Sequence, residues 1–200
     1  MLLRDANDAV ESLRRDTRLY LPALSKRRGF SSSRVEHLLN RLVQRMPQSE
    51  CYLEVGVLEG RTLEAASIGN DGKILMGLDP CKKYDFVPDG FGPNVAFFPV
   101  RWQDMPDPPL PIGVSFYDGD HSVEETRDFM LAIGERLADE AVLVLDDWDR
   151  ETVRDGAFEA AHRSSRWRLL RECPEYGDGV TVPQQKFGYS FGISVWGWKK

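Results

Sequence analysis

Apolar residues in this chain form short runs that alternate with longer, periodically patterned segments. The short runs are apolar at nearly every position, which predicts strands buried on both faces. They lie at residues 52–54, 74–78, 95–100, 112–117, 141–145 and 167–170. A last stretch, residues 189–198, alternates about glycines and predicts a seventh strand that returns antiparallel. Strands of this kind are typical of a mostly parallel sheet covered by helices on both sides.

The segments between these runs carry the spacing of amphipathic helices. Helices are predicted at residues 5–18, 33–46, 63–68 and 122–137, and around residues 153–161. The strongest pattern is the second, an apolar stripe that stops at Pro47. Ser33 with Glu36, and Ser122 with Glu125, have the spacing of a capping box, in which two side chains satisfy free N–H groups at a helix start.

Alternating strands and helices predict a single α/β domain over residues 1–200, with a doubly wound sheet. Residues 1–47 form an N-terminal helical cap and residues 51–200 form the core. A loop is predicted at residues 81–94, which are rich in Lys, Pro and Gly. A chain of 200 residues can bury a sufficient core without disulfides or metals.

The composition is that of a globular protein, with 42% hydrophobic and 29% charged residues. No apolar run approaches the roughly 20 residues that cross a bilayer, and the N-terminal residues do not have the pattern of a signal peptide. We therefore expect a cytoplasmic protein without a membrane partner. Cys51, Cys81 and Cys173 are widely separated, which argues against a disulfide framework or a zinc site.

The net charge of −6 argues against nucleic acid as the main partner. The charge is uneven, because residues 1–45 hold ten Lys or Arg against five Asp or Glu. This basic end is either a solvated helical face or a surface that meets an anionic substrate or a neighbouring subunit. The aromatic stretch 196–198 is a candidate edge contact in a homo-oligomer.

A glycine-containing turn follows the first predicted strand, where Gly56 and Gly60 come after Glu54 and before a helix. Glycines let the backbone approach a ligand closely, and the start of a helix presents free N–H groups. The spacing lacks the third glycine of a dinucleotide-binding fingerprint. The turn is therefore either a ligand-binding turn or the tight connection that any strand–helix unit needs.

Carboxylates lie at the ends of four of the first five predicted strands: Glu54, Asp79, Asp118, and the pair Asp146 and Asp147. The carboxyl ends of parallel strands lie along one edge of a sheet, so these side chains are expected to converge. Convergence of like charges is costly unless ribose hydroxyls or a divalent cation lie among them. Asp118, Asp146 and Asp147 are oxygen donors suited to Mg²⁺ or Mn²⁺, although any one acid here can instead cap the next helix.

His121 is the histidine nearest this edge in the sequence. Imidazole has a pKa suited to accepting a proton near neutral pH, which makes His121 a candidate catalytic group. The alternative is a residue at a helix start that bonds locally.

These residues resemble a known family, the class I S-adenosylmethionine-dependent methyltransferases. Glu54 to Gly60 resembles the family's first motif, and Asp79 matches the acid that binds the ribose of the cofactor. The resemblance covers residues 52–147 and implies a seven-stranded sheet in the order 3-2-1-4-5-7-6. It also implies that residues 51–200 are the cofactor-binding core.

Within the family the chain is more similar to metal-dependent O-methyltransferases of the catechol, caffeoyl-CoA and macrocin types. Residues 116–122 and 144–147 resemble their two metal-binding segments, and residues 101–104 resemble the segment beside the adenine. The implied metal ligands are Asp118, Asp146 and Asp147. The implied cofactor-binding residues are Glu54, Gly56, Gly60, Thr62, Asp79, Trp102, Gln103 and Asp118.

Two departures from the catechol type affect the site. Its third ligand is Asn, whereas Asp147 here is as in the macrocin type. Its lysine base corresponds by count to His121, so His121 and Asp118 are the implied catalytic residues and the base stays open.

The resemblance implies O-methylation of a small-molecule hydroxyl group (a catechol, diol or sugar) with S-adenosylmethionine and Mg²⁺ or Mn²⁺. The alternatives are a non-catalytic module that binds S-adenosylmethionine or a nucleotide, and a nicotinamide oxidoreductase. The missing third glycine argues against the oxidoreductase.

Overall fold

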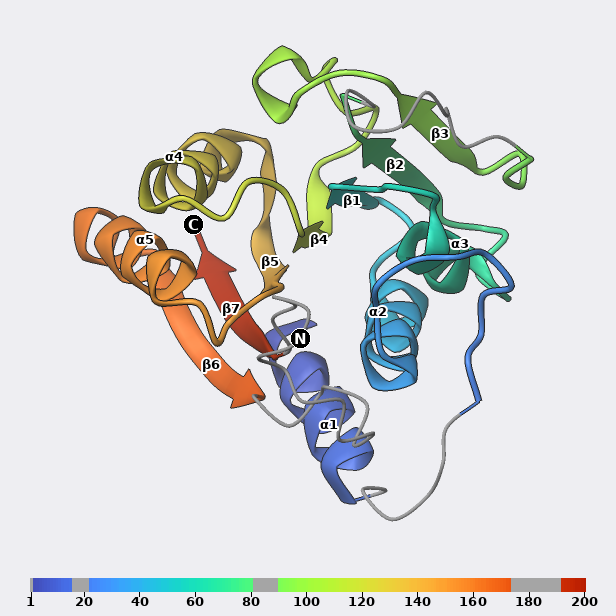
Figure 1. Cartoon of the computed structure of the whole chain (residues 1–200), viewed down its shortest axis with the longest axis horizontal. Coiled ribbons are helices and arrows are strands. Elements are labelled where there is room, and N and C mark those ends of the chain that lie inside the picture. Colours follow the sequence, from blue (N-terminus) through green and yellow to red (C-terminus); the bar gives the residue numbers. More distant parts are fainter. Residues whose placement is uncertain (1, 16–21, 81–89, 174–191) are drawn as a thin grey trace.

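A computed structural model describes residues 2–15, 22–80, 90–173 and 192–200 of the chain. Within this part, seven strands form one sheet in the order β3-β2-β1-β4-β5-β7-β6 (Figure 1). The strands are β1 (Cys51–Val55), β2 (Ile74–Leu78), β3 (Val95–Phe98), β4 (Ile112–Tyr117), β5 (Leu137–Leu145), β6 (Trp167–Cys173) and β7 (Ile193–Lys199). The first five strands run parallel, and β7 lies antiparallel between β5 and β6. The predicted sheet and its strand order are therefore confirmed.

Helices cover both faces of the sheet (Figure 1). One face carries α1 (Leu2–Arg15), α2 (Ser33–Arg45) and α3 (Arg61–Ser67), and the other carries α4 (Val123–Ile133) and α5 (Glu151–Arg163). Successive strand residues point to opposite faces, so Tyr52 packs in the core under α2 and Leu53 packs in the core under α4. This double burial explains why the strands read as continuous apolar runs. No helix in the described ranges has the length and apolar character needed to cross a membrane.

Some element boundaries differ from the prediction. The helix predicted over residues 122–137 ends at Ile133, a short 3₁₀ turn follows, and Leu137 is the first residue of β5. Leu137 is buried in the same core as the helix, so its apolar character fitted the helical pattern equally well. The predictions for residues 16–18, 81–89 and 189–191 lie outside the described residues.

The predicted capping box at Ser33 and Glu36 is wrong in both members. The helix cap is Ser32, whose Oγ accepts from the Val35 N–H at 3.2 Å. Glu36 is fully buried and accepts from the backbone N–H groups of Leu24 (2.7 Å) and Ser25 (3.1 Å).

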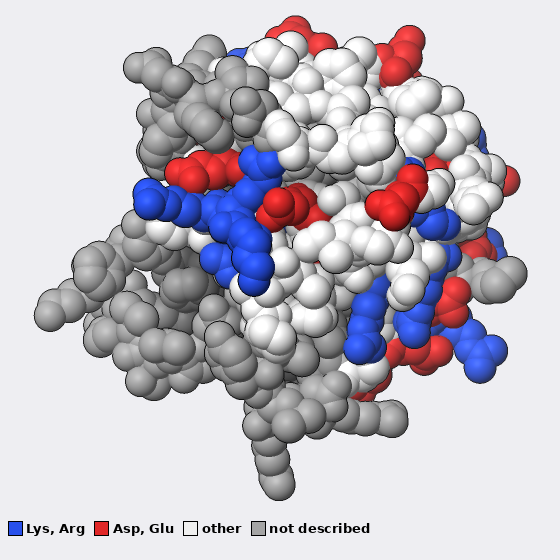
Figure 2. Space-filling model, turned by 90° about the vertical axis from the view of Figure 1, so that its right-hand side faces the viewer, with Lys and Arg blue, Asp and Glu red and all other residues white. Residues whose placement is uncertain are grey.

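Glu36 also accepts from Arg61 Nε at 2.6 Å, so one buried carboxylate joins the segment before α2 to the first residue of α3. Nearby, Arg27 pairs with Glu64 at 3.5 Å. On the face that carries Lys26, basic side chains gather around acidic ones (Figure 2). Arg27 and Arg61 thus form ion pairs with acids of the same chain.

Replacing Glu36 by alanine removes the acceptor of a guanidinium and of two backbone N–H groups in the interior. We expect the Glu36→Ala variant to lose about 3 kcal/mol of unfolding free energy, measured by urea denaturation. Gln44→Ala, an exposed position on the same helix, is the control and should change stability by less than about 0.5 kcal/mol. Equal stability of the two variants would contradict the role of Glu36.

Candidate functional site

A cavity of about 560 Å³ opens at the carboxyl ends of β1, β2 and β4. Its walls come from four connections that leave the sheet along this edge, after β1, β2, β3 and β4. The residues that line it are Val55, Gly56, Leu58, Leu78, Asp79, Pro80, Val100, Arg101, Trp102, Gln103, Asp118, Gly119, Asp120, His121 and Glu125. Ligands in open α/β sheets bind at this type of position.

The turn after β1 is held tightly against its two neighbours. Gly56 has a φ of 89°, and a Cβ at this position would lie 1.8 Å from the backbone oxygen of Asp118. The Leu58 N–H donates to Asp79 Oδ2 at 2.8 Å, and Leu58 itself has a positive φ of 51°. Only glycine fits at position 56, and the turn is fixed between the ends of β2 and β4.

A second wall of the cavity is formed by the 3₁₀ turn η1 (Trp102–Asp104) and the start of α4. Trp102 Nε1 donates to Glu125 Oε2 at 2.8 Å, and Gln103 Nε2 lies 3.0 Å from both oxygens of the same carboxylate. The Trp102 ring also packs edge-on against Phe129, with 5.6 Å between ring centroids. These contacts hold both side chains of the turn in one arrangement.

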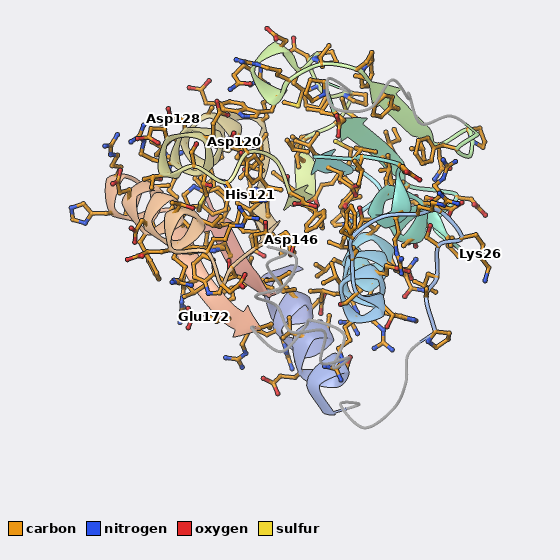
Figure 3. The ribbon with its side chains drawn as sticks, viewed as in Figure 1. Lys26, Asp120, His121, Asp128, Asp146 and Glu172 are labelled. Atoms are coloured by element: carbon orange, nitrogen blue, oxygen red, sulfur yellow. The ribbon has the colours of Figure 1, made fainter. Side chains whose placement is uncertain are left out.

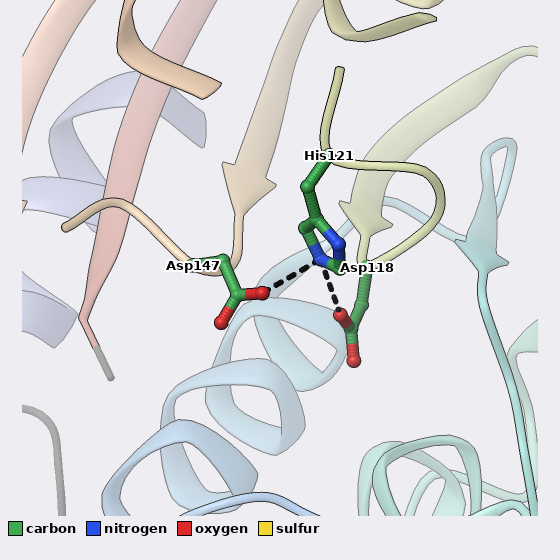
Figure 4. Close-up of side chains that lie close together, drawn as sticks. All are labelled: Asp118, His121 and Asp147. Atoms are coloured by element: carbon green, nitrogen blue, oxygen red, sulfur yellow. Dashed lines mark hydrogen bonds and ion pairs between the residues drawn. The ribbon is translucent and has the colours of Figure 1, made fainter. Parts of the chain in front are cut away.

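In the cavity wall, His121 lies between two carboxylates (Figure 4). Its Nε2 is 2.8 Å from Asp147 Oδ2 and 3.4 Å from Asp118 Oδ1. Arg150 Nε approaches the same Asp147 oxygen at 3.0 Å. Asp146 follows β5 beside this group, whereas Lys26 lies on a distant side of the molecule (Figure 3). Lys26 therefore does not supply the counter-charge for these acids.

The carboxylates of this cluster disfavour one another's charged forms. Burial raises the pKa of Asp118 to about 6, and the charge of Asp147 contributes to the shift. Burial and repulsion from Asp118 and Asp147 raise the pKa of Asp146 well above its usual range. Burial alone would lower the pKa of His121, but its hydrogen bonds to Asp118 and Asp147 raise it to about 9. Burial and like charge thus favour the protonated forms of Asp118 and Asp146, and hydrogen bonds to the carboxylates favour protonated His121.

This donor set fits a divalent cation. One oxygen each of Asp118 and Asp147 and one nitrogen of His121 lie within 4.8 Å of one another, which is compact enough for a shared ion. Asp146, the third ligand expected from the sequence, is not part of this compact group. Carboxylate oxygens are the ligands that Mg²⁺ and Mn²⁺ prefer, and a cation would offset the repulsion that raises the acid pKa values. Asp147 also has a positive φ of 51°, a backbone conformation that often marks functional sites.

The residues singled out from the sequence fall into three groups. Six of them line the cavity: Gly56, Asp79, Trp102, Gln103, Asp118 and His121. Asp146 and Asp147 lie beside it, in contact or close electrostatic interaction with Asp118 and His121. Glu54, Gly60 and Thr62 are absent from the cavity lining.

Glu54 lies beneath the turn and is fully buried. Its carboxyl group accepts from the Tyr52 hydroxyl and from Thr62 Oγ1, each at 2.7 Å. The side chain therefore joins β1 to the first turn of α3.

Glu125 is the cavity residue that the sequence analysis interpreted differently. Its spacing from Ser122 suggested a helix cap, and the Ser122 Oγ does accept from the Glu125 N–H at 3.3 Å. The Glu125 side chain, however, turns to Trp102 and Gln103. The sequence does show an acid in the first turn of the helix that follows β4. Its spacing from Ser122, however, was interpreted as part of a helix cap.

Burial raises the pKa of Glu54 to about 8, against the lowering effect of the hydrogen bonds from Thr62 and Tyr52. The folded chain therefore keeps a proton between about pH 4.5 and pH 8 that the unfolded chain loses, so stability falls as pH rises through this window.

Glutamine resembles the protonated acid and does not titrate. From pH 5 to pH 8 we expect the stability of Glu54→Gln to rise relative to the wild type, on the order of 3 kcal/mol, measured by urea denaturation. Glu135→Gln, at an exposed position, should show no such trend. A constant difference between Glu54→Gln and the wild type would show that Glu54 is ionised in the folded chain.

No family model matches the sequence, and no curated protein matches it either. Solved structures do match. The O-methyltransferase from Bacillus cereus in complex with SAH has 14% identity and a TM-score of 0.60, with 98% of this chain and 91% of that chain covered. Cofactor-bound Rv0187 from MTB has 15% identity and a TM-score of 0.60, covering 98% and 88%.

The precorrin-6y C5,15-methyltransferase from Geobacter metallireducens GS-15 has 16% identity and a TM-score of 0.53, covering 84% of this chain and 89% of that chain. The structural similarity establishes the fold. Identities this low do not identify the methyl acceptor. The strand order, the glycine turn and these likenesses agree: the chain has the fold of the class I S-adenosylmethionine-dependent O-methyltransferases.

Proposed function

We propose that this chain is an S-adenosylmethionine-dependent O-methyltransferase that uses a divalent metal to methylate a hydroxyl group of a small molecule. The observation that carries the proposal is the position of Asp118, which lines the cavity and also belongs to the cluster suited to a cation. A methyl donor in the cavity would lie beside the acceptor's binding site. The SAH complex of the Bacillus cereus enzyme supports the choice of cofactor.

In this proposal the cavity binds S-adenosylmethionine, which supplies the activated methyl group. The turn at Gly56 lets the backbone approach the methionine part, and Asp79 accepts hydrogen bonds from the ribose hydroxyls. Trp102 and Gln103 form the wall beside the adenine. The cavity's volume of about 560 Å³ is in the range of pockets that bind molecules of this size.

Asp118, Asp146 and Asp147 would hold Mg²⁺ or Mn²⁺. When bound there, such an ion would supply Lewis acidity that makes the acceptor's hydroxyl group easier to deprotonate near neutral pH. The three aspartates orient the acceptor against the cavity, which is the protein's main contribution to a transfer between two bound molecules. A catechol, a vicinal diol or a sugar has two neighbouring oxygens and fits this arrangement.

We assign His121 as the group that takes the acceptor's proton. Asp118 and Asp147 raise its pKa to about 9, and a cation bound to these carboxylates would lower it again, so that the neutral His121 ring could accept a proton near neutral pH. Its Nε2 faces Asp147 at 2.8 Å and Asp118 at 3.4 Å, so both carboxylates orient the ring at the edge of the cavity. An imidazole held in this way can pass a proton to solvent, because a quarter of its side chain is exposed (26%).

Calorimetry with S-adenosylhomocysteine, combined with methyl transfer to a panel of catechols, phenols, diols and sugars, tests the function. Binding, with a mass gain of one methyl group that depends on Mg²⁺ or Mn²⁺, is the expected result. Binding without transfer to any acceptor favours a non-catalytic module. Absence of binding rejects both the methyltransferase and the non-catalytic module.

Asp146→Ala separates the metal from the cofactor. We expect divalent-dependent turnover to fall by at least about 100-fold while the dissociation constant for S-adenosylhomocysteine changes less than about threefold. Asp149→Ala, at an exposed position three residues on, serves as the control and should retain activity. Comparable losses of turnover and cofactor binding would instead indicate that Asp146 supports the fold.

A further inference from the structure

We infer that Glu125 is a positioning residue: it fixes Trp102 and Gln103 in the wall beside the adenine and thereby sets the affinity and base selectivity of the cavity. The inference rests on the proposed function, because it takes the bound molecule to be an adenine nucleoside. It concerns a residue that neither the glycine turn nor the acidic cluster includes.

The Glu125 carboxylate receives every hydrogen bond that links η1 to α4. Oε2 accepts from Trp102 Nε1 at 2.8 Å and from Gln103 Nε2 at 3.0 Å, and Oε1 accepts from the same Gln103 nitrogen at 3.0 Å. An ionised carboxylate only accepts, and an indole N–H only donates. Both donors are therefore directed at Glu125, and hydrogen bonds to a charged partner are the stronger kind.

The turn that carries Trp102 and Gln103 has little structure of its own. It is a 3₁₀ turn of three residues, whereas Glu125 and Phe129 lie one turn apart on the same side of α4. Phe129 contacts the Trp102 ring and stacks on Tyr117 with 4.5 Å between centroids. Helix α4 thus holds the short turn at two points and links it to the end of β4.

A purely local role for Glu125 would be the second half of a capping box, in which its side chain returns to the backbone N–H of Ser122. In the structure, the Ser122 N–H instead donates to Oδ1 of Asp120 at 2.8 Å. The cap is completed by another acid, and Glu125 is left to hold the cavity wall.

The arrangement also has a consequence for which base the cavity accepts. Because the Gln103 amide nitrogen is committed to Glu125, its carbonyl oxygen is the end that remains for a ligand. A carbonyl oxygen accepts from the exocyclic amino group of adenine and is repelled by the carbonyl that replaces it in hypoxanthine. Glu125 therefore favours adenine indirectly, by preventing rotation of the Gln103 amide.

Calorimetric titration of the full chain with S-adenosylhomocysteine tests the indirect action. We expect Glu125→Ala to weaken binding about tenfold, and Trp102→Phe with Gln103→Ala to weaken it by a similar factor. Trp102→Phe keeps an aromatic ring against Phe129 and removes the N–H donor together with part of the ring area. If Glu125 acts through these two residues, adding Glu125→Ala to the double variant causes no further loss.

Selectivity gives a readout that a merely structural role would not change. The wild type should bind S-adenosylhomocysteine at least about tenfold more tightly than S-inosylhomocysteine, its deaminated analogue. Glu125→Gln preserves the size of the side chain and places a donor against Gln103, which allows the Gln103 amide to rotate. This variant should keep the wild-type melting temperature and lose most of the preference.

Glu124→Ala is the matched control, since Glu124 is the exposed neighbour in the same helical turn. It should retain the wild-type affinity and selectivity. Wild-type affinity in Glu125→Ala, a full second loss in the triple variant, or unchanged selectivity in Glu125→Gln would overturn the inference while leaving the proposed function intact. Failure of the wild type to bind S-adenosylhomocysteine would overturn both.

Discussion

The convergence of carboxylates at one edge of the sheet is the constraint on which the rest of the site depends. Parallel pairing of β1, β4 and β5 places Asp118 and the Asp146–Asp147 pair at neighbouring strand ends. Burial, together with repulsion among these acids, raises the pKa values of Asp118 and Asp146, and hydrogen bonds to Asp118 and Asp147 raise the pKa of His121. Positive charge stabilises a site built in this way, and Arg150 and His121 supply part of it next to Asp147.

Much of the fold could be predicted from local pattern. Continuous apolar runs indicated the buried strands, and the glycine turn and strand-end acids indicated the edge where the cavity opens. The order of the strands, by contrast, came from the resemblance to a family, because periodicity describes each strand separately and does not say which strands pair. The start of β5 was misplaced for a similar reason, since a buried leucine fits the end of a helix as well as the start of a strand.

The glutamates of both predicted capping boxes make contacts that the sequence did not predict. In each, the glutamate has the spacing of a local partner but uses its carboxylate for a distant one. Glu36 bonds Arg61, 25 residues away, and Glu125 bonds Trp102, 23 residues away. A spacing rule cannot anticipate these contacts, because Arg61 and Trp102 come close to the two carboxylates only after the chain has folded. An acid with the spacing of a helix cap can therefore bind a side chain that is far away in the sequence.

The left-handed backbone at Asp147 bears on how such a site can diverge. Aspartate, asparagine and glycine adopt this conformation at the lowest cost, whereas branched side chains adopt it poorly. The position can therefore exchange a charged oxygen donor for a neutral one without any rearrangement of the main chain. Evolution can in this way adjust the net charge of the acidic cluster through a single substitution that leaves the architecture unchanged; in the proposed metal site, such a change would also alter the acidity of the acceptors that can react.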